Sequence, residues 1–167
     1  MKNTILLLFT LTISYYSYGQ SEAYQYYSEG IVKSDSGDHV KAIDDYSKAI
    51  EMDSEFIEAY YNRGYSKSKL GDDKGAIQDF TKVIELDSKS DVAYYLRGYS
   101  KMLIGDYSEA LQDFTKAIEI NPEDASFYKT RGSVKLILGD INGACLDWSK
   151  AGKLGYDIYG KINKYCN

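Results

Sequence analysis

Apolar residues along this chain recur with helical spacing, and the whole pattern repeats at a longer interval. In residues 76–84 the apolar positions lie three and four apart, which predicts one buried face of an α-helix, and residues 110–118 repeat it. Small residues share a period of 34: Gly30, Gly64, Gly98 and Gly132; Gly37, Gly71, Gly105 and Gly139; Ala42, Ala76, Ala110 and Ala144. A fixed period of this length indicates one supersecondary unit stacked in series. We therefore predict an all-α solenoid.

Each 34-residue unit is interpreted as two helices joined by a tight turn. In residues 57–90, Leu70–Gly71–Asp72 ends the first helix and begins the second. Glycine accepts the left-handed conformation beyond a helix C-terminus, and aspartate caps the free N–H groups of the next helix. The capping position is occupied throughout, by Asp38, Asp72, Asp106 and Asp140. Asp106 is followed three residues later by Glu109, which predicts a reciprocal capping box.

The repeated unit resembles the tetratricopeptide repeat. The residues that carry the resemblance are clearest in the third unit: Tyr94, Gly98, Ala110, Phe114, Ala117 and Pro122. The resemblance covers four units, at residues 23–56, 57–90, 91–124 and 125–158. It implies a right-handed α-α superhelix of four helix pairs. Apolar residues at helical spacing follow in residues 156–166, and we predict a capping helix there, because stacked repeats leave an open apolar end.

Residues 1–19 do not belong to the repeat. A positive charge at Lys2, an apolar run from Ile5 to Ile13, and the small residues Ser17 and Gly19 are typical of a secretory signal peptide. We expect cleavage after Gly19 and an exported protein, periplasmic or secreted; an uncleaved anchor is the alternative. Beyond this segment no apolar stretch approaches the ~20 residues of a transmembrane helix, so no membrane span is expected in the mature chain.

Two cysteines, Cys145 and Cys166, lie near the C-terminus. An even number of cysteines in an exported chain favours a disulfide, and both residues fall on apolar helical faces. We predict that the bond ties the capping helix to the fourth unit. The alternative is two separate, partly buried thiols.

Charged residues recur with the same period. Three arginines stand just before the repeated glycines, at Arg63, Arg97 and Arg131, and aspartates recur at Asp45, Asp79, Asp113 and Asp147. The first unit has Glu29 at the arginine position, which favours pairs that reach back to the preceding unit. The predicted inter-repeat pairs are Arg63–Asp45, Arg97–Asp79 and Arg131–Asp113. The alternative is an arginine cluster that captures anionic ligands.

In the tetratricopeptide family the first helices line a concave groove. The resemblance therefore implies a peptide-binding groove here, at Tyr27, Tyr61, Tyr65, Tyr95, Tyr99, Met102 and Lys129. Tyrosine combines an apolar body with a polar tip, which suits a partly wet recognition surface. An acidic, tyrosine-lined groove favours an apolar or mildly basic segment of a partner protein, while the carboxylate clamp of co-chaperone members is absent. The alternative is that tyrosine is the preferred packing aromatic, since the chain has 18.

Composition narrows the function further. The net charge of −5 becomes −6 when Lys2 leaves with the signal, which argues against nucleic acid as a partner. The sole histidine, His39, lies in a turn, and no zinc-type spacing or phosphate-binding loop occurs, so no catalytic residue, metal or cofactor is expected. We predict a non-enzymatic protein–protein interaction or scaffold module. The alternatives are a small-ligand or glycan binder, and a self-assembling structural subunit of the cell envelope joined through the first repeat.

Overall fold

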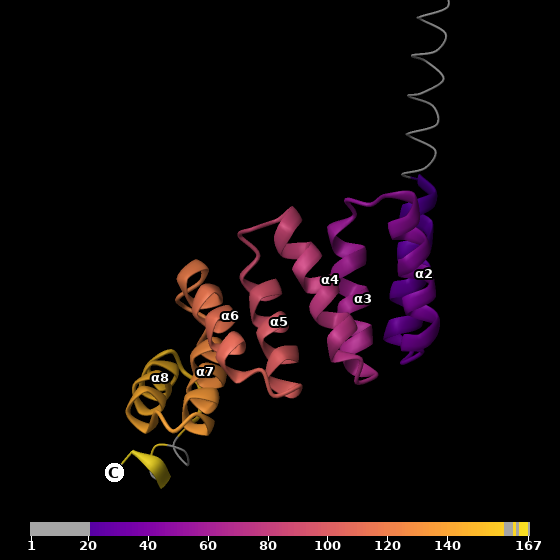
Figure 1. Cartoon of the computed structure of the whole chain (residues 1–167). Coiled ribbons are helices and arrows are strands. Elements are labelled where there is room, and N and C mark those ends of the chain that lie inside the picture. Colours follow the sequence, from indigo (N-terminus) through magenta and orange to yellow (C-terminus); the bar gives the residue numbers. More distant parts are fainter. Residues whose placement is uncertain (1–20, 159–161, 163, 167) are drawn as a thin grey trace, which may run out of the picture. The chain divides into compact units, whose positions relative to one another are not determined.

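The computed structural model describes residues 21–158, 162 and 164–166, and all regular structure among them is helical. The described helices are residues 21–35, α2 His39–Met52, α3 Ile57–Lys69, α4 Asp73–Leu86, α5 Asp91–Leu103, α6 Tyr107–Ile120, α7 Ala125–Ile137 and α8 Ile141–Lys153 (Figure 1). The predicted all-α class is confirmed. The chain divides into two compact units, residues 1–71 and 72–167, and each is described by itself.

The tight turns form where the repeated glycines predicted them. The four turn glycines have positive φ angles: Gly37 84°, Gly71 80°, Gly105 90° and Gly139 85°. After α5, the N–H of Gly105 donates to the carbonyl of Met102 (3.1 Å) and the N–H of Asp106 to that of Lys101 (2.9 Å). These two hydrogen bonds form a Schellman motif. The motif places Gly105 in the left-handed conformation, which glycine adopts most easily because it has no Cβ.

Aspartates cap the second helices in three of the four repeats. The carboxylates of Asp38, Asp72 and Asp140 each accept from the backbone N–H three residues on, at 3.2, 2.9 and 2.8 Å. The capping box predicted at Asp106 and Glu109 is wrong. Within the described part of the chain the Asp106 side chain makes no capping bond, and the Glu109 carboxylate lies 3.3 Å from the Lys101 ammonium instead.

This difference between caps predicts unequal costs of substitution. Asp140→Ala should lower the free energy of unfolding by about 1 kcal/mol, because an N–H of α8 loses its acceptor. Asp106→Ala should cost only a few tenths of a kcal/mol, because its side chain makes no such bond. Urea denaturation followed by circular dichroism at 222 nm measures both variants. Equal losses would contradict the assigned caps.

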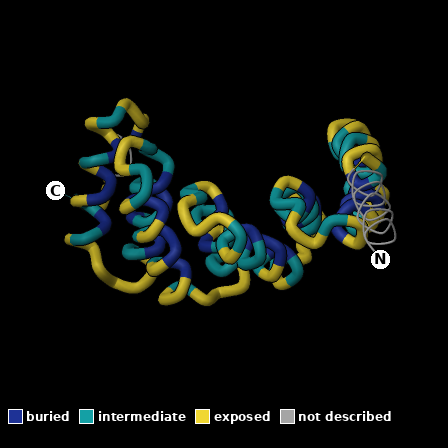
Figure 2. The backbone as a smooth tube through the Cα atoms, turned by 90° about the horizontal axis from the view of Figure 1, so that it is seen from above, coloured by how far each residue is buried: buried dark blue, intermediate teal, exposed yellow. Residues whose placement is uncertain are grey.

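Figure 2 marks the buried positions along the helices. The buried residues combine small and large side chains. In the 72–167 unit, α7 and α8 approach closely at Gly132, where an added Cβ would lie 2.7 Å from Nε1 of Trp148. Trp148 is fully buried, as predicted for the repeated large position, and Phe114 is buried at the same position in α6. In the 1–71 unit, Tyr46 fills this position and is also buried. Each small residue therefore leaves room for one large side chain.

The segment after α8 packs back on that helix. Ile158 is buried with Trp148 and Ala151, and Ile162 and Cys166 border the same cluster. The N–H of Ile162 donates to the Ile158 carbonyl and that of Cys166 to the Ile162 carbonyl, as in a helix. Residues 156–158 are not helical, and residues 159–161 and 163, within the predicted capping helix, lie outside the described residues.

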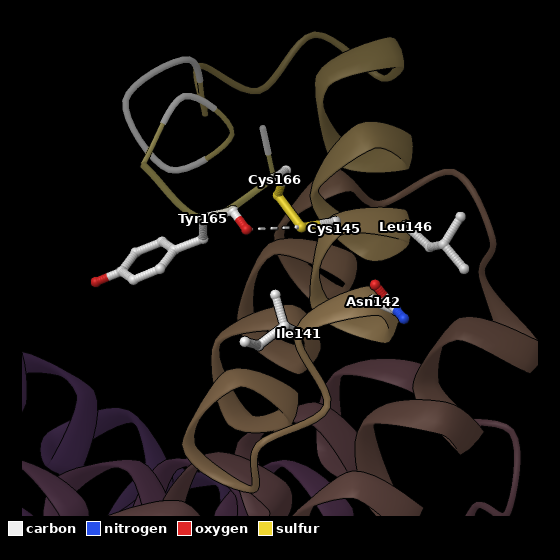
Figure 3. Close-up of a pocket in the computed structure, with 6 residues that line it drawn as sticks. All are labelled: Ile141, Asn142, Cys145, Leu146, Tyr165 and Cys166. Carbon is white, nitrogen blue, oxygen red and sulfur yellow. Dashed lines mark hydrogen bonds between the residues drawn. A yellow bond between two sulfur atoms is a disulfide. The ribbon is translucent and has the colours of Figure 1, made fainter.

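The predicted disulfide is present between Cys145 on α8 and Cys166, with their Cα atoms 5.6 Å apart (Figure 3). The bond therefore joins the C-terminal segment to the second helix of the fourth repeat, as the sequence indicated.

The predicted signal peptide, residues 1–19, lies outside the described residues. Among the described helices, none is both long enough and apolar enough to cross a membrane.

Candidate functional site

Two buried aspartates on second helices of the 72–167 unit, Asp113 and Asp147, bind two cations each. Asp113 on α6 is only 4% exposed. Arg97 donates to both of its carboxylate oxygens, from Nε at 3.0 Å and from Nη2 at 2.6 Å, and the Lys101 ammonium lies 3.0 Å away. The next repeat has the same arrangement around Asp147, with the arginine bonds at 2.9 and 2.7 Å and the lysine at 2.9 Å. Each carboxylate is therefore neutralised by the first helix of its own repeat.

The inter-repeat pairing predicted for these charges is wrong. Arg97 binds Asp113 and not Asp79, and Arg131 binds Asp147 and not Asp113. The reason is geometric: an arginine and the aspartate 16 residues later lie on facing sides of two helices that pack directly against each other, α5 against α6 and α7 against α8.

Each of these arginines also donates a hydrogen bond to a hydroxyl group of the preceding repeat. Nη1 of Arg97 donates to Oγ1 of Thr81 at 3.2 Å, and Nη1 of Arg131 donates to Thr115 at 3.2 Å. In the 1–71 unit, Nη1 of Arg63 donates to Oγ of Ser47 at 3.1 Å. Arg97 and Arg131 therefore each connect their own helix pair to the preceding second helix.

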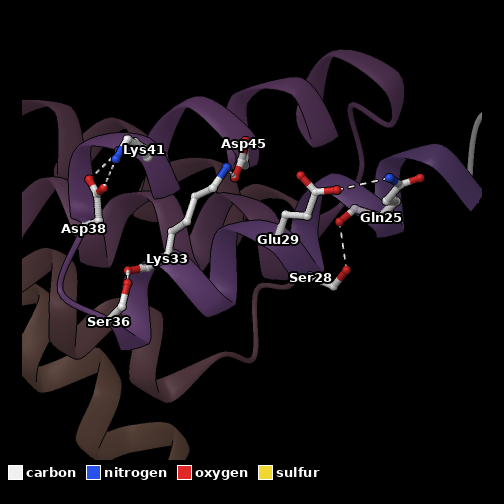
Figure 4. Close-up of polar contacts among 8 residues, drawn as sticks. All are labelled: Gln25, Ser28, Glu29, Lys33, Ser36, Asp38, Lys41 and Asp45. Atoms are coloured by element: carbon white, nitrogen blue, oxygen red, sulfur yellow. Dashed lines mark hydrogen bonds and ion pairs between the residues drawn. The ribbon is translucent and has the colours of Figure 1, made fainter.

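The first repeat shows why Glu29 can replace an arginine. Asp45, predicted to pair with Arg63, is bound by Lys33 of its own repeat (Figure 4). The hydrogen bond to Asp45 raises the pKa of the Lys33 ammonium. The sequence signal that we missed is a lysine with the 34-residue period, four residues after each arginine position: Lys33, Lys67, Lys101 and Lys135. A lysine alone neutralises the first carboxylate.

These contacts also weaken the alternative of an arginine cluster for anions. The Arg97 guanidinium is committed to Asp113 and Thr81, and it lies 5.5 Å from the centre of the Tyr94 ring. Arg131 has the equivalent partners, including the Tyr128 ring at 5.7 Å. Both positive charges are balanced inside the protein.

Tyr27, assigned to the groove by resemblance, is a packing residue in the 1–71 unit. Its ring lies 4.8 Å from that of Phe56 and 6.0 Å from that of Tyr46, and its hydroxyl accepts a hydrogen bond from Asn62 at 3.1 Å. Burial raises the pKa of the Tyr27 phenol, and the Glu58 carboxylate adds to the rise. The phenol therefore stays protonated at neutral pH and links the first two repeats.

Tyr61 and Tyr65 follow one another by one helical turn on α3. Burial raises the pKa of Tyr61, and the neighbouring Tyr65 adds to the rise. Tyr65 is exposed, and the Lys69 ammonium lies 4.9 Å from its ring centre. Of this pair, Tyr65 is the side chain that a partner can reach.

In the 72–167 unit, Tyr95 and Tyr99 on α5 also differ in exposure. The Tyr95 ring stacks 4.9 Å from Phe127, and the Tyr95 hydroxyl lies 3.2 Å from Oγ1 of Thr130, so this residue packs between α5 and α7. Tyr99, 6.3 Å away, is exposed. The other two predicted groove residues are half-buried: Met102 borders the cluster of Ala110, Phe114 and Val134, and the Lys129 ammonium lies 5.0 Å from the Tyr156 ring.

One face of α5 presents an apolar surface to solvent. Val92, Tyr99 and Leu103 are 40%, 39% and 52% exposed, and their spacing of seven and four residues places them on one side of the helix. We call these three residues the α5 stripe. Sequence reasoning named Tyr99 but missed Val92, because valine at a helical position is expected in the core.

A shallow hollow lies elsewhere in this unit, on the outer side of α8. It has a volume of about 540 Å³ and is lined by Ile141, Asn142, Cys145, Leu146, Tyr165 and Cys166 (Figure 3). Both cysteines of the disulfide therefore border space open to solvent. Among the described residues no group of histidine, cysteine, aspartate or glutamate side chains could hold a metal ion.

Comparison with known families identifies the repeat. Residues 57–90 and 92–124 match the model of the tetratricopeptide repeat, and residues 33–71 match a second model described as TPR repeat. Together the matched ranges span more than half of the chain. The chain belongs to the tetratricopeptide repeat family. The matches end at residue 124, and the charge network of Arg131, Lys135 and Asp147 shows that α7 and α8 form an equivalent pair.

Solved structures with a similar fold include tetratricopeptide proteins of different kinds. A crystal structure of MamA protein is 26% identical, with a TM-score of 0.77, and the match covers 80% of this chain and 73% of that one. MamA from Desulfovibrio magneticus RS-1 is 21% identical, with a TM-score of 0.76 and coverage of 79% and 75%. The first TPR of Spaghetti (RPAP3), bound to the HSP90 peptide SRMEEVD, is 21% identical, with a TM-score of 0.70 and coverage of 72% and 95%. The comparison with curated proteins gave no match.

Proposed function

We propose that this tetratricopeptide repeat protein is an exported, non-enzymatic interaction module that binds a segment of a partner protein on its first helices. Proteins of this family generally mediate protein–protein interactions, and the RPAP3 repeat of similar fold was solved with a peptide. The observation that carries the proposal for this chain is the α5 stripe. A folded surface helix ordinarily keeps its apolar residues inside, so three exposed in line favour a binding surface.

The stripe also suggests the chemistry of the segment. Val92, Tyr99 and Leu103 offer apolar surface along α5, while the Tyr99 hydroxyl offers a polar contact. A helix or extended strand with apolar side chains at regular intervals matches such a surface. The carboxylate clamp remains absent, because Tyr27, Ile31, Tyr61 and Tyr65 occupy its positions. We therefore do not assign this protein the ligand printed for RPAP3.

The test uses a peptide selected from a random library on the full wild-type protein. The double variant Tyr99→Ser/Leu103→Ser should bind this peptide at least about tenfold more weakly, since two exposed apolar anchors are lost. Its thermal midpoint should stay close to that of the wild type, because both side chains are exposed. Isothermal titration calorimetry and thermal denaturation measure the two quantities.

The matched control is Leu146→Ser, which removes an even more exposed leucine from α8. It should leave peptide affinity unchanged. Undiminished binding by the stripe variant would refute the assignment, and equal loss in both variants would show that the peptide responds to exposed leucines in general.

Self-assembly through the first repeat, an alternative interpretation of the sequence, has less support. Its outer helix carries polar contacts of its own, from Gln25 to Glu29 at 3.1 Å and from Ser28 to the Gln25 carbonyl at 2.8 Å (Figure 4). At the position of Gln25, the third and fourth repeats have Ala93 and Phe127, which are buried. These polar residues cover part of the terminal face, as the end of a solenoid requires, although Val32 on the same side of the helix is 69% exposed.

Export rests on the signal-like pattern of residues 1–19 and on the disulfide. A disulfide is compatible with an oxidising compartment outside the cytosol. The proposed location is the periplasm or the medium, after cleavage near Gly19.

A further inference from the structure

The C-terminal segment contacts α8 as the first helix of another repeat would. In the third and fourth repeats, Phe127 packs with Ala117, and Val134 packs with Phe114. At the end of the chain, Ile158 packs with Ala151, and the Tyr165 ring lies 5.9 Å from that of Trp148. Phe127 and Val134 are seven residues apart, and so are Ile158 and Tyr165. Ile158 and Tyr165 therefore occupy the places of two residues of a following first helix, in the same register.

The C-terminal segment has no arginine at the position that connects two repeats in α7. In α7, Arg131 binds both Asp147 and Thr115, which connects two repeats. The equivalent position in the C-terminal segment is Ile162, four residues after Ile158, and the equivalent hydroxyl on α8, Ser149, is exposed. The disulfide from Cys166 to Cys145 supplies a covalent connection where the arginine contacts are missing.

The bond is also accessible. Both cysteines border the hollow of about 540 Å³, and neither is fully buried. A thiolate entering there can attack one sulfur and form a mixed disulfide while the other cysteine leaves as a thiolate. The second thiol of the same reductant then resolves the mixed disulfide. Two electrons and two protons pass from the dithiol to the protein, which ends with two free thiols.

We propose that the Cys145–Cys166 bond is a reducible lock on the C-terminal segment, opened by a dithiol. In the oxidised protein the segment covers the end of the fourth repeat. Reduction releases it, because the remaining contacts of Ile158, Ile162 and Tyr165 must then offset the entropy of ordering the segment unaided. Release uncovers the side of α8 that surrounds Trp148. The α7–α8 pair keeps its fold, since the bonds of Arg131 and Lys135 to Asp147 do not involve the segment.

Trp148 reports on this event directly, because it is the only tryptophan in the chain and is fully buried. On the full protein, dithiothreitol should raise the acrylamide quenching constant of Trp148 by about twofold or more, as expected for local opening. Circular dichroism at 222 nm should change little, and reoxidation should restore the original quenching.

The double variant Cys145→Ser/Cys166→Ser lacks the disulfide without any reductant. It therefore distinguishes loss of the bond from other effects of dithiothreitol. It should show the raised quenching without any treatment and should not respond to dithiothreitol. Reduced wild-type protein that is quenched like the oxidised form would overturn the proposal, since the segment would then stay docked without the bond. Loss of most helical signal on reduction would overturn it too, because the bond would then hold the whole unit together.

Discussion

Replacing Asp113 with alanine should lower the free energy of unfolding by about 3–5 kcal/mol. The carboxylate is buried on α6 and binds both Arg97 and Lys101. Its removal leaves Arg97 without a counter-charge and leaves Lys101 with the exposed Glu109 carboxylate alone, although both cations are mostly buried. Urea denaturation followed by circular dichroism measures the loss, and Asp147→Ala should behave alike in the fourth repeat.

Glu109→Ala is the matched control for this substitution. Glu109 also binds Lys101, at 3.3 Å, but its side chain is 63% exposed. Water screens such a pair, so its loss should cost only ~0–1 kcal/mol. If Asp113→Ala costs no more than Glu109→Ala, the buried network does not stabilise the protein in the way described.

Replacing Trp148 with alanine should cost about 3–5 kcal/mol of unfolding free energy. The indole is enclosed by Ala144, Ala151 and Ile158, and its N–H donates to the Lys129 carbonyl at 3.2 Å. Truncation leaves a cavity where α7, α8 and the C-terminal segment meet. Urea denaturation followed by circular dichroism at 222 nm measures the loss, because the variant has no tryptophan to follow.

The control is Trp148→Phe, since phenylalanine occupies the same repeat position at Phe80 and Phe114. This variant keeps most of the ring volume but loses the hydrogen bond to Lys129. A loss of roughly 1–2 kcal/mol is expected, well below that of alanine. Equal losses for the two variants would assign the stabilisation to the hydrogen bond and not to packing.

The helices and their ends follow from the sequence because they depend on local rules. Glycine at a left-handed turn position and aspartate before a helix act within a few residues, so Gly71 and Asp72 could be interpreted without a structure. The burial of Trp148 followed from its place in an apolar stripe. The disulfide depended on more distant contacts, and two cysteines leave only one intramolecular pairing to consider.

The direction of the charge pairs could not be taken from periodicity alone. Arg97 lies 18 residues after Asp79 and 16 residues before Asp113, and a repeat makes both partners available at every arginine. Because α5 packs against both α4 and α6, the choice depends on the side of α5 from which Arg97 extends, and this side faces α6. The first repeat did contain the answer, because Lys33 remains there with Asp45 while the arginine is absent.

Exposure of individual tyrosines was equally hard to predict. Tyr95 and Tyr99 lie one turn apart on α5, and their chemistry is identical. Tyr95 is covered because Phe127 and Thr130 from α7 reach it, whereas Tyr99 lies beyond their reach and remains exposed. This difference depends on which residues of α5 the side chains of α7 cover. The sequence around each tyrosine does not specify that.

In the third and fourth helix pairs, each buried aspartate is neutralised by cations of the same pair. The cations that pair with Asp113 and Asp147 belong to the same 34-residue repeat as each aspartate. Duplicating or excising such a block leaves no orphan ion in the protein interior. An array of this kind can therefore change its length by whole repeats during evolution or engineering, with a hydroxyl contact and apolar packing, but no buried ion pair, to re-form at each new junction.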